Sequence, residues 1–360
     1  MRVVYSAEHL RHSPQHEYLD GRAISNFEVP ERAETIRRAL EDDDAFTFEP
    51  PTDHGSGPIE AVHDSAMLAW LERVWREWRA AGEEAAEIIP DTFPLPAYHE
   101  GMPPTKSSSG PRAAGAWMFD AATPIVEGTY AAARASVDVA LTTADLVLGG
   151  ELIAYGLCRP PGHHAARAMM GGYCFFNNAA IVAEDLVRRV GSRVAILDVD
   201  YHHGNGTQQV FYARGDVLYV SLHGDPERAY PYFSGFADET GSGPGAGANL
   251  NLPLPIRCSN DEYLEALAIG LDAIERFAPD QLVVSLGIDT YQLDPICDLA
   301  LTSRGYDETG RRVGGLGRPT VVLQEGGYHV AHLGSNVRTW LRGLEELDAG
   351  PPPEIRRPSG

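Results

Sequence analysis

Short runs of apolar residues, most of them continuous rather than alternating, constrain the fold of this chain more than any other feature. They lie at residues 3–6, 152–157, 194–200, 217–223, 282–289 and 320–327. A continuous apolar run of this length is typical of a strand in a parallel sheet that is covered on both faces. The runs are separated by helical stretches at 31–43, 129–147, 178–190, 261–277 and 336–347. This alternation predicts an α/β fold with a central, mostly parallel sheet and helices on both faces.

Two loops and the C-terminal tail interrupt the alternation. Residues 88–115 and 241–247 are rich in Gly, Pro or Ser, and a long loop inside a compact domain is usually functional or disordered. We expect the tail at 349–360 to be disordered. Because no linker divides the rest of the chain, we predict a single domain at 1–348 with an inserted loop at about 88–115.

The balance of charges excludes some classes of partner. The chain carries 29 Lys+Arg and 51 Asp+Glu, a formal net charge of −22. This excess argues against a nucleic-acid binder, which neutralises phosphates with basic residues, and against a polybasic membrane surface. No apolar run is long enough to span a bilayer, and the N-terminus lacks the pattern of a signal peptide, so we expect a cytoplasmic protein. The four cysteines form no CxxC pair, which argues against a cysteine zinc site.

Acidic and histidine side chains lie at the ends of predicted strands, where ligands bind in parallel α/β sheets. In an extended segment, side chains two residues apart share a face, so Asp198, Asp200 and His202 should point together. Asp289, at the end of another strand, is the natural further ligand. One histidine and two carboxylates suit Zn²⁺ and leave a coordination position open for water. The alternative is that isolated Asp and His residues at strand ends are capping groups.

Two further motifs could act on a substrate beside such a metal. His163 and His164 follow a rigid Pro-Pro-Gly turn, and paired imidazoles could take a proton from water and return it to a leaving amine. Tyr328 follows two glycines, and its phenol could donate a hydrogen bond to a carbonyl oxygen that gains negative charge. Taken singly, a histidine pair is more often structural, and a tyrosine in a loop is ordinary.

Several strings occur together in one order along the chain: CRPPGHHA, GGYCFFNNAA, AILDVDYHHGNGTQ, SLHGDP, VVSLGIDT, LDP and EGGY. In combination they resemble the histone deacetylase and acetylpolyamine amidohydrolase family, and more closely its bacterial acetylpolyamine amidohydrolase branch. The resemblance covers most of residues 1–345. It implies a single-domain, arginase-like α/β fold and a zinc-dependent amide hydrolase that releases acetate and a free amine.

The resemblance also implies a role for each matched residue. It assigns one Zn²⁺ to Asp200, His202 and Asp289. It gives acid/base and electrostatic roles to His163 and His164, and polarisation of the scissile carbonyl to Tyr328. The residues that would contact these groups without touching the substrate are Asp198 and Asn205. Contacts with the substrate would be made by Gly172, Tyr173, Tyr230, Glu17 and Ile296.

Family members also hold structural K⁺ or Na⁺ ions, which the resemblance places at two sites. One site would be formed by Asp198, Asp200, His202, Ser221 and Leu222. The other would use the backbone carbonyls of Phe211, Arg214 and Val217.

Three positions distinguish this chain within the fold. Gly204 and Gly287 stand where arginase-like enzymes with two Mn²⁺ ions have aspartates, so a single metal ion is expected. Asn205 stands where some family members have an aspartate beside the second histidine. Because an amide cannot stabilise imidazolium by charge, we expect a less basic His164 than an aspartate would give.

The acylated amine and the assembly are less constrained than the reaction. The 88–115 segment looks like the insertion that supports dimers in the polyamine branch, so a homodimer through this loop is expected. Its later part carries Lys106 and Arg112 rather than carboxylates, whereas Glu17 matches an acidic position of the branch, and Asp91 and Glu100 look like solvated charges. The predicted substrate is a small cationic N-acetylated amine. The alternatives are an acetyl-lysine peptide or another acylamine, a dinuclear ureohydrolase, and a binder of acylamines without catalysis.

Overall fold

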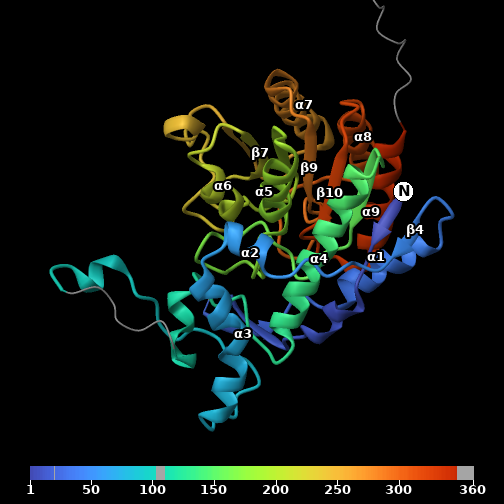
Figure 1. The fold of residues 1–360 in the computed structure, drawn as a ribbon. Coiled ribbons are helices and arrows are strands. Elements are labelled where there is room, and N and C mark those ends of the chain that lie inside the picture. Colours follow the sequence, from blue (N-terminus) through green and yellow to red (C-terminus); the bar gives the residue numbers. More distant parts are fainter. Residues whose placement is uncertain (20, 103–109, 347–360) are drawn as a thin grey trace, which may run out of the picture.

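A parallel sheet forms the centre of the part of the chain described by the computed structural model, which covers residues 1–19, 21–102 and 110–346 (Figure 1). Its eight strands lie in the order β4-β1-β5-β10-β9-β6-β7-β8, and every neighbouring pair is parallel. The strands are β1 (Arg2–Val4), β4 (Thr47–Glu49), β5 (Ile153–Gly156), β6 (Val194–Asp198), β7 (Val217–Gly224), β8 (Asn249–Leu254), β9 (Gln281–Leu286) and β10 (Thr320–Gln324).

Helices cover both faces of this sheet. One face packs against α4 (Thr129–Leu148), α5 (Asn178–Val190) and α6 (Asn205–Phe211), and α2 (Gly57–Val62) and α3 (Ser65–Ala80) belong to the same apolar cluster, with α2 against α5. The other face packs against α1 (Glu31–Glu41), α7 (Asn260–Phe277), α8 (Ser303–Gly314) and α9 (Val330–Glu345). This architecture confirms the predicted α/β fold with a parallel sheet between two layers of helices.

Strand β6 shows why the apolar runs are continuous. Val194 and Ile196 belong to the apolar cluster on one face of the sheet, whereas Ala195 and Leu197 belong to the cluster on the other. Full burial of one large apolar side chain contributes about 1.5–3 kcal/mol. A strand that is covered on both faces therefore needs an apolar residue at every position, not at alternate ones.

The predicted strands all exist, but five of the six end earlier than expected, and three of these five carry residues of the candidate site beyond their ends. β6 ends at Asp198, β9 at Leu286 and β10 at Gln324, so the polar residues beyond them lie in loops. The expectation that residues 198–202 form one extended strand was therefore wrong, because only Asp198 lies in it. The carboxylates of Asp198 and Asp200 nevertheless both reach His163, at 3.1 and 3.8 Å from its ring nitrogens. The helix expected at 336–347 begins earlier, at Val330, and ends at Glu345.

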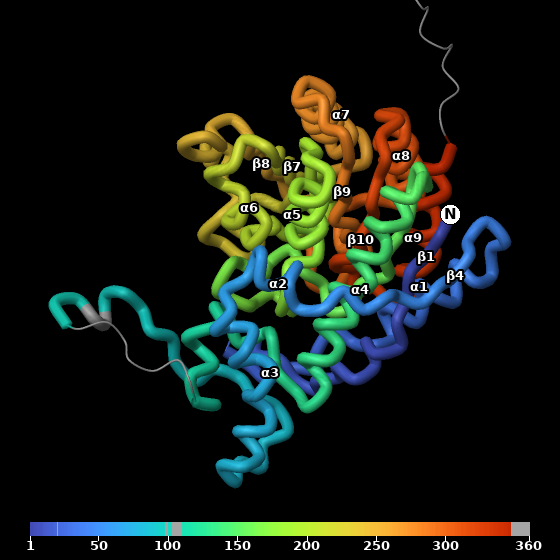
Figure 2. Tube along the Cα trace, viewed as in Figure 1, coloured from blue at the N-terminus to red at the C-terminus, as the bar shows by residue number. Residues whose placement is uncertain are grey.

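The segment predicted as an inserted loop projects away from the sheet (Figures 1 and 2). Its described parts contain two short 3-10 turns, at Pro96–His99 and Pro111–Ala116. Trp70 of α3 anchors its base, because its indole nitrogen donates to Gly110 O at 3.0 Å. Lys106 and the tail at 349–360 lie outside the described residues.

An antiparallel hairpin, β2 (His16–Leu19) and β3 (Arg22–Ser25), adds a small second sheet. It brings Glu17, Tyr18 and Leu19 to the lining of the cavity described below. None of the helices in the described part of the chain is long and apolar enough to cross a membrane.

Candidate active site

The loops after four adjacent strands meet at one edge of the sheet. In the order β5, β10, β9 and β6 these strands are neighbours and parallel, so their carboxyl ends lie side by side. The loop after β5 carries His163 and His164, and the loop after β10 carries Tyr328. Asp289 follows β9, and Asp200 and His202 follow β6. Residues that lie up to 165 positions apart in sequence are brought together by strand order alone.

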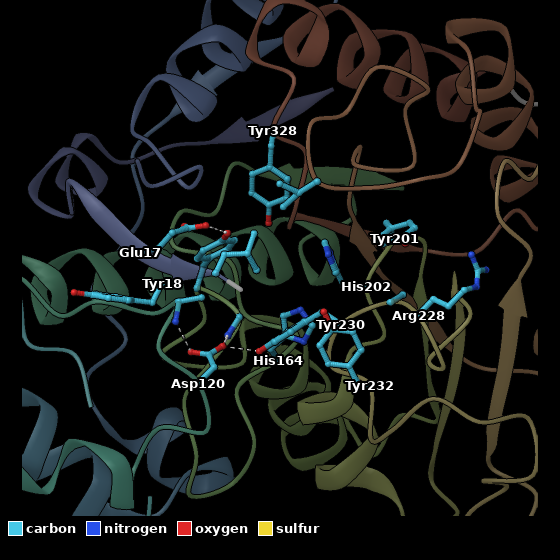
Figure 3. A pocket seen from close by; sticks show the side chains of 16 residues that line it. Glu17, Tyr18, Asp120, His164, Tyr201, His202, Arg228, Tyr230, Tyr232 and Tyr328 are labelled. Atoms are coloured by element: carbon cyan, nitrogen blue, oxygen red, sulfur yellow. Dashed lines mark hydrogen bonds between the residues drawn. The ribbon is translucent and has the colours of Figure 1, made fainter. Parts of the chain in front are cut away.

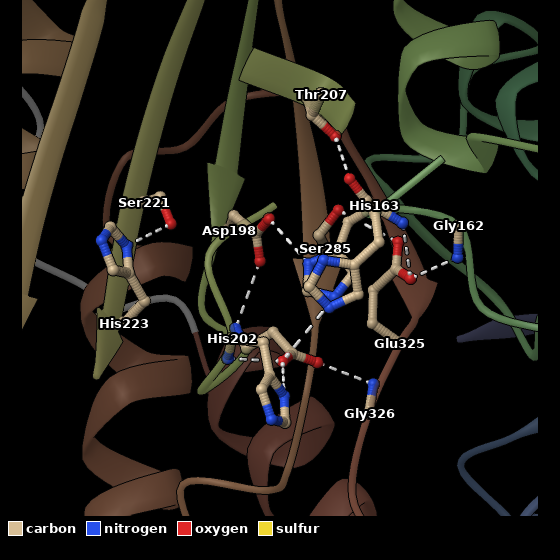
Figure 4. A network of polar contacts seen from close by, with 12 residues as sticks. Gly162, His163, Asp198, His202, Thr207, Ser221, His223, Ser285, Glu325 and Gly326 are labelled. Atoms are coloured by element: carbon tan, nitrogen blue, oxygen red, sulfur yellow. Dashed lines mark hydrogen bonds and ion pairs between the residues drawn. The ribbon is translucent and has the colours of Figure 1, made fainter. Parts of the chain in front are cut away.

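Two carboxylates and one imidazole converge at the centre of this edge. Figure 4 shows this imidazole, of His202, in the same polar network as His163, Asp198 and Glu325. His202 Nδ1 lies 3.0 Å from Asp289 Oδ2 and 3.3 Å from Asp200 Oδ1. Backbone amides fix the other oxygens: Gly326 N donates to Asp200 Oδ2 at 2.7 Å, and Tyr201 N donates to Asp289 Oδ1 at 2.8 Å. Both aspartates are fully buried. The three side chains therefore present a preorganised set of oxygen and nitrogen donors for a cation.

The electrostatics of this set favour a bound cation. Burial, and then the charge of Asp200, raises the pKa of Asp289 to about 7. Although burial acts against it, the charges of His163 and His202 hold the pKa of Asp200 below its usual value. Burial opposes protonation of His202, but hydrogen bonds to both aspartates raise its pKa to about 9. Without a cation, bound protons must neutralise the charges of Asp200 and Asp289, and a metal ion would replace these protons.

Glycines close the space around these carboxylates. A Cβ at Gly287 would clash with Asp200 Oδ2, and a Cβ at Gly204 would clash with Asp198 Oδ2. A larger residue cannot enter either position without displacing a carboxylate. The two positions where a second metal ion would need aspartates are thus closed by packing.

Cys297 is an additional potential ligand that sequence reasoning missed. Its sulfur lies within 4.8 Å of donor atoms of His202 and Asp289. No motif surrounds this cysteine in the sequence, and only the path of the chain after β9 brings it near the centre.

His163 is held from two sides by carboxylates. Its Nδ1 lies 3.1 Å from Asp198 Oδ2, and its backbone amide donates to Glu325 Oε2 at 3.2 Å. Burial lowers the pKa of His163, but Asp200 and Asp198 outweigh it and raise the value to about 10. Glu325 is fully buried, and burial raises its pKa to about 7. Sequence reasoning missed Glu325, although a carboxylate directly after an apolar strand was a usable signal.

His164 has a neutral partner. Its Nδ1 lies 2.7 Å from Asn205 Oδ1, and because that oxygen can only accept, Nδ1 carries the hydrogen and Nε2 is left as a base. Burial, together with the charges of His163 and His202, holds the pKa of His164 well below its usual value. The imidazole is therefore neutral and able to accept a proton.

Tyr328 faces the same cavity from the loop after β10 (Figure 3). Burial raises the pKa of its phenol well above the usual value, so the hydroxyl remains a hydrogen-bond donor. The guanidinium of Arg32 lies 4.7 Å from the ring centre and donates to Gly327 O at 2.6 Å. Asp294 Oδ2 accepts from the Tyr328 amide at 2.8 Å. The loop that positions the phenol is thus fixed on both sides.

A cavity of about 300 Å³ leads from the surface to these groups (Figure 3). Every residue predicted to contact a substrate lines it, namely Glu17, Gly172, Tyr173, Tyr230 and Ile296. The phenol of Tyr173 donates to Glu17 Oε1 at 3.0 Å. Burial raises the pKa of Glu17 to about 7. The cavity thus combines aromatic walls with one carboxylate that ionises near neutral pH.

Other lining residues were not anticipated, and other acidic candidates lie elsewhere. Asp120, Tyr201, Arg228 and Tyr232 also line the cavity, although they belong to no motif. The lining found among the described residues contains neither Asp91 nor Glu100. Asp91 is exposed and lies 3.7 Å from the exposed Arg112.

The residues expected to hold monovalent cations fall at two places. Ser221 and Leu222 lie near the end of β7, beside the end of β6, and Ser221 Oγ is 2.8 Å from His223 Nδ1. Phe211 ends α6, Val217 begins β7, and Arg214 lies between them. The assignment of ions to these residues remains a prediction.

Comparison with known proteins adds an independent line of argument. A family model described as the histone deacetylase domain matches residues 26–344. The chain is 43% identical over 345 residues to acetylpolyamine amidohydrolase 1 of Pseudomonas aeruginosa, covering 96% of this chain and 99% of that protein. It is 42% identical over 344 residues to the acetylpolyamine amidohydrolase of Mycoplana ramosa, with the same coverage. The crystal structure of an acetylpolyamine aminohydrolase from Burkholderia pseudomallei superimposes with a TM-score of 0.91 at 42% identity, covering 96% of this chain and 99% of that chain.

Proposed function

The chain belongs to the histone deacetylase family, and from that premise we propose that it removes the acetyl group from small cationic acylamines of the acetylpolyamine class. The observation that carries the proposal is the cavity of Figure 3. Its lining includes the carboxylate of Glu17, the potential metal ligand His202, the neutral His164 and the phenol of Tyr328. The relatives named as acetylpolyamine amidohydrolases support the substrate class.

The donor set fits one Zn²⁺ ion. Asp200, His202 and Asp289 would hold it, because two carboxylates and an imidazole are ligands that zinc accepts in open catalytic sites. Bound there, zinc would supply Lewis acidity to the amide carbonyl and acidity to a water molecule. The glycines at 204 and 287 disfavour the dinuclear alternative, since a side chain at either position would clash with Asp198 or Asp200.

The two histidines divide the proton transfers. His164 is neutral, with Nε2 unprotonated, so it is the residue suited to accept the proton of the attacking water. His163, between Asp198 and Glu325, is suited to remain protonated and to stabilise negative charge. The leaving nitrogen then takes a proton from the imidazolium of His164, which releases acetate and a free amine.

Tyr328 acts on the carbonyl oxygen. Its high pKa keeps the hydroxyl protonated, so it can donate a hydrogen bond that strengthens as the oxygen gains negative charge. The contact with Arg32 and the backbone bond to Asp294 hold the phenol at the cavity before a substrate arrives. This rigidity favours the transition state because no reorganisation is needed during the reaction.

Glu17 is suited to bind the distal ammonium of the substrate. It is 1% exposed, lines the cavity and keeps contacts with the Tyr173 hydroxyl and the Phe27 amide. A carboxylate in a partly dehydrated cavity attracts an ammonium more strongly than one in water. An acetyl-lysine side chain, the alternative substrate, would carry no charge at that depth.

We further propose the arrangement around this centre. Residues 1–348 would form the zinc-dependent deacetylase domain, with structural K⁺ or Na⁺ ions at the two sites near β6 and β7. The projecting 88–115 segment would form a homodimer contact, which its exposed Leu95 and Met102 support.

One experiment tests the reaction and the substrate class together. Acetate release would be measured from N-acetylputrescine and N-acetylbutylamine, which differ in the distal ammonium, and from an acetyl-lysine peptide, with metal analysis on the same sample. We expect about one zinc ion per chain, and a kcat/KM for the cationic amine that exceeds that of the neutral amine by about tenfold or more. Equal values would overturn the cationic substrate class, and the absence of acetate would overturn the reaction. Urea production with two metal ions per chain would support the dinuclear alternative.

A further inference from the structure

A carboxylate with no assigned role connects the two walls of the cavity. Asp120 Oδ2 accepts two short hydrogen bonds, both of 2.6 Å: one from the Gly172 amide and one from the Tyr230 hydroxyl (Figure 3). Its other oxygen accepts from Thr123 Oγ1 at 2.9 Å and from Ala122 N at 3.1 Å. Four donors satisfy the acceptor capacity of this carboxylate. The acceptor positions of Asp120 are therefore filled by groups of the protein. Its side chain acts as a brace, because it joins the wall at Gly172 to the wall at Tyr230.

The residues around Asp120 hold the same two walls by packing. Phe119 stacks on the Tyr230 ring, with centroids 6.1 Å apart and planes 21° apart. On the other side, a Cβ at Gly171 would clash with the Phe119 ring, so this wall lies against it without a gap. Thr123 Oγ1 accepts from the Tyr173 amide at 3.0 Å. Residues 119–123 thus clamp both walls through hydrogen bonds and packing.

One of the walls needs this support because its backbone is strained. Gly172 and Tyr173 have φ values of +55° and +66°. Glycine adopts this left-handed region freely, but a residue with a side chain, such as Tyr173, is strained in it. Such a conformation persists when surrounding contacts fix it, and here Asp120 and Thr123 hold the two amides.

The braced walls flank the groups proposed to react. The Tyr230 ring lies 5.0 Å from the His164 ring, and the Tyr173 ring lies 5.7 Å from the Tyr328 ring. Gly172 lies so close to His164 that a Cβ would clash with the imidazole. The distance between the two walls is therefore fixed next to His164 and Tyr328. A substrate whose amide lies at these groups would place the carbon bonded to its amide nitrogen between the walls.

We propose that Asp120 is a positioning residue that fixes the distance between the Gly172–Tyr173 wall and the Tyr230 wall, and thereby selects acylamines that are unbranched beside the amide. The inference rests on the proposed function, because it concerns the same cavity. It adds a determinant of specificity that neither touches the metal centre nor binds the ammonium.

A pair of substrates isolates this determinant. We would measure kcat/KM for N-acetylcadaverine and for its analogue with one methyl group on the carbon bonded to the amide nitrogen. A rigid pocket discriminates one carbon by roughly 10- to 200-fold, so the wild-type ratio of linear to branched substrate should lie in this range. The ratio cancels any loss of folded or metal-loaded enzyme, which lowers both rates equally.

Two variants weaken the brace to different extents. Tyr230→Phe removes one hydrogen bond and keeps the ring, whereas Asp120→Ala removes all four bonds. The matched control is Tyr5→Phe, which removes the contacts of the Tyr5 hydroxyl with Glu34 at 2.7 Å and His9 at 3.3 Å, none of which belongs to the cavity lining. We expect the ratio to fall about fivefold or more in both brace variants, toward the lower discrimination of a wider pocket, and to stay at the wild-type value in the control.

Each outcome decides the question. If Asp120→Ala does not fold, Tyr230→Phe alone carries the test, since its cavity keeps every ring. An unchanged ratio in Tyr230→Phe, or a wild-type ratio near unity, would overturn the role of Asp120 and leave the proposed reaction intact. Failure of the wild type to release acetate from either amine would overturn the proposed function, and this inference with it.

Discussion

A buried carboxylate between two arginines offers the sharpest test of how the loop bearing Tyr328 is supported. Glu28 Oε1 accepts from Arg32 Nη1 at 2.7 Å and from Arg159 Nε at 2.9 Å, and none of the three side chains is more than 2% exposed. Arg32 continues the network to the loop through Gly327 O and Glu325 O, both at 2.6 Å. Replacing Glu28 by glutamine removes the charge that neutralises two buried guanidinium groups.

The size of the effect follows from these contacts. Each charge-assisted hydrogen bond contributes about 1.5–3 kcal/mol, and loss of one partner of a buried ion pair costs about 3–5 kcal/mol because the other charge stays buried. We therefore expect Glu28→Gln to lower the free energy of unfolding by about 3–5 kcal/mol. The measurement is urea unfolding, followed by tryptophan fluorescence and circular dichroism under identical metal conditions.

A surface ion pair provides the matched control. Glu41 accepts two bonds of 2.6 Å from Arg37 Nη1, but it is 44% exposed. Glu41→Gln should cost no more than about 1 kcal/mol, since water solvates both charges when the pair is broken. A loss below about 1 kcal/mol for Glu28→Gln, equal to that of the control, would refute the reasoning about buried charge.

Three further predictions concern catalysis. Tyr328→Phe should leave metal content unchanged and cut turnover by about 10²–10³; turnover near the wild-type value would remove the phenol from the mechanism. Because burial raises the pKa of Glu17 to about 7, kcat/KM for a cationic acylamine should rise with pH through this value as the carboxylate forms. That rise should vanish in Glu17→Gln, and its persistence would assign the titration to another group. Asn205→Asp should favour the imidazolium of His164, which raises its pKa by about 1–3 units and moves the acid limb of the pH–rate profile upward; an unshifted limb would contradict this.

The parts of the fold that could be predicted are those in which local sequence and tertiary structure agree. The central strands are continuous apolar runs because both of their faces are buried, and α5 was predicted with its observed bounds of Asn178–Val190. Asn177 caps its first turn by accepting from Ala180 N, and Gly191 ends it in a left-handed conformation. Wherever such local signals were absent or misleading, the prediction failed.

Helix α8 is the clearest case of a misleading signal. Its sequence contains Gly305, Gly310 and Gly314, and glycine disfavours a helix by about 1 kcal/mol relative to alanine. The structure explains why they are present. A Cβ at Gly310 would clash with Trp340 O of α9, and a Cβ at Gly314 would clash with Leu344 O. Close packing of two helices therefore requires residues that, read alone, argue against a helix.

Strand β8 was missed for a different reason. Asn249, Asn251 and Pro253 are unusual in strands, but β8 lies at the edge of the sheet, where proline is tolerated. Both asparagine amides donate to Gln208 Oε1 at 2.8 Å. The amide nitrogens of both residues thus have a partner on α6 that the local sequence does not indicate.

The residues of the candidate site likewise fall into those that the local sequence indicates and those that it does not. Residues that belong to short motifs, such as His163 and His164, could be predicted because the residue types and their spacing lie within a few consecutive positions. Asp120 and Glu28 could not be predicted, because their roles depend on hydrogen-bond partners up to 131 positions away. The sequence does not distinguish a carboxylate that is solvated from one that joins two walls of a cavity. The net charge of −22 likewise does not show which of the acidic side chains are buried. Only the geometry identifies Asp120 as a brace, so the proposed determinant of specificity could not be found from the motifs, which indicate the reaction.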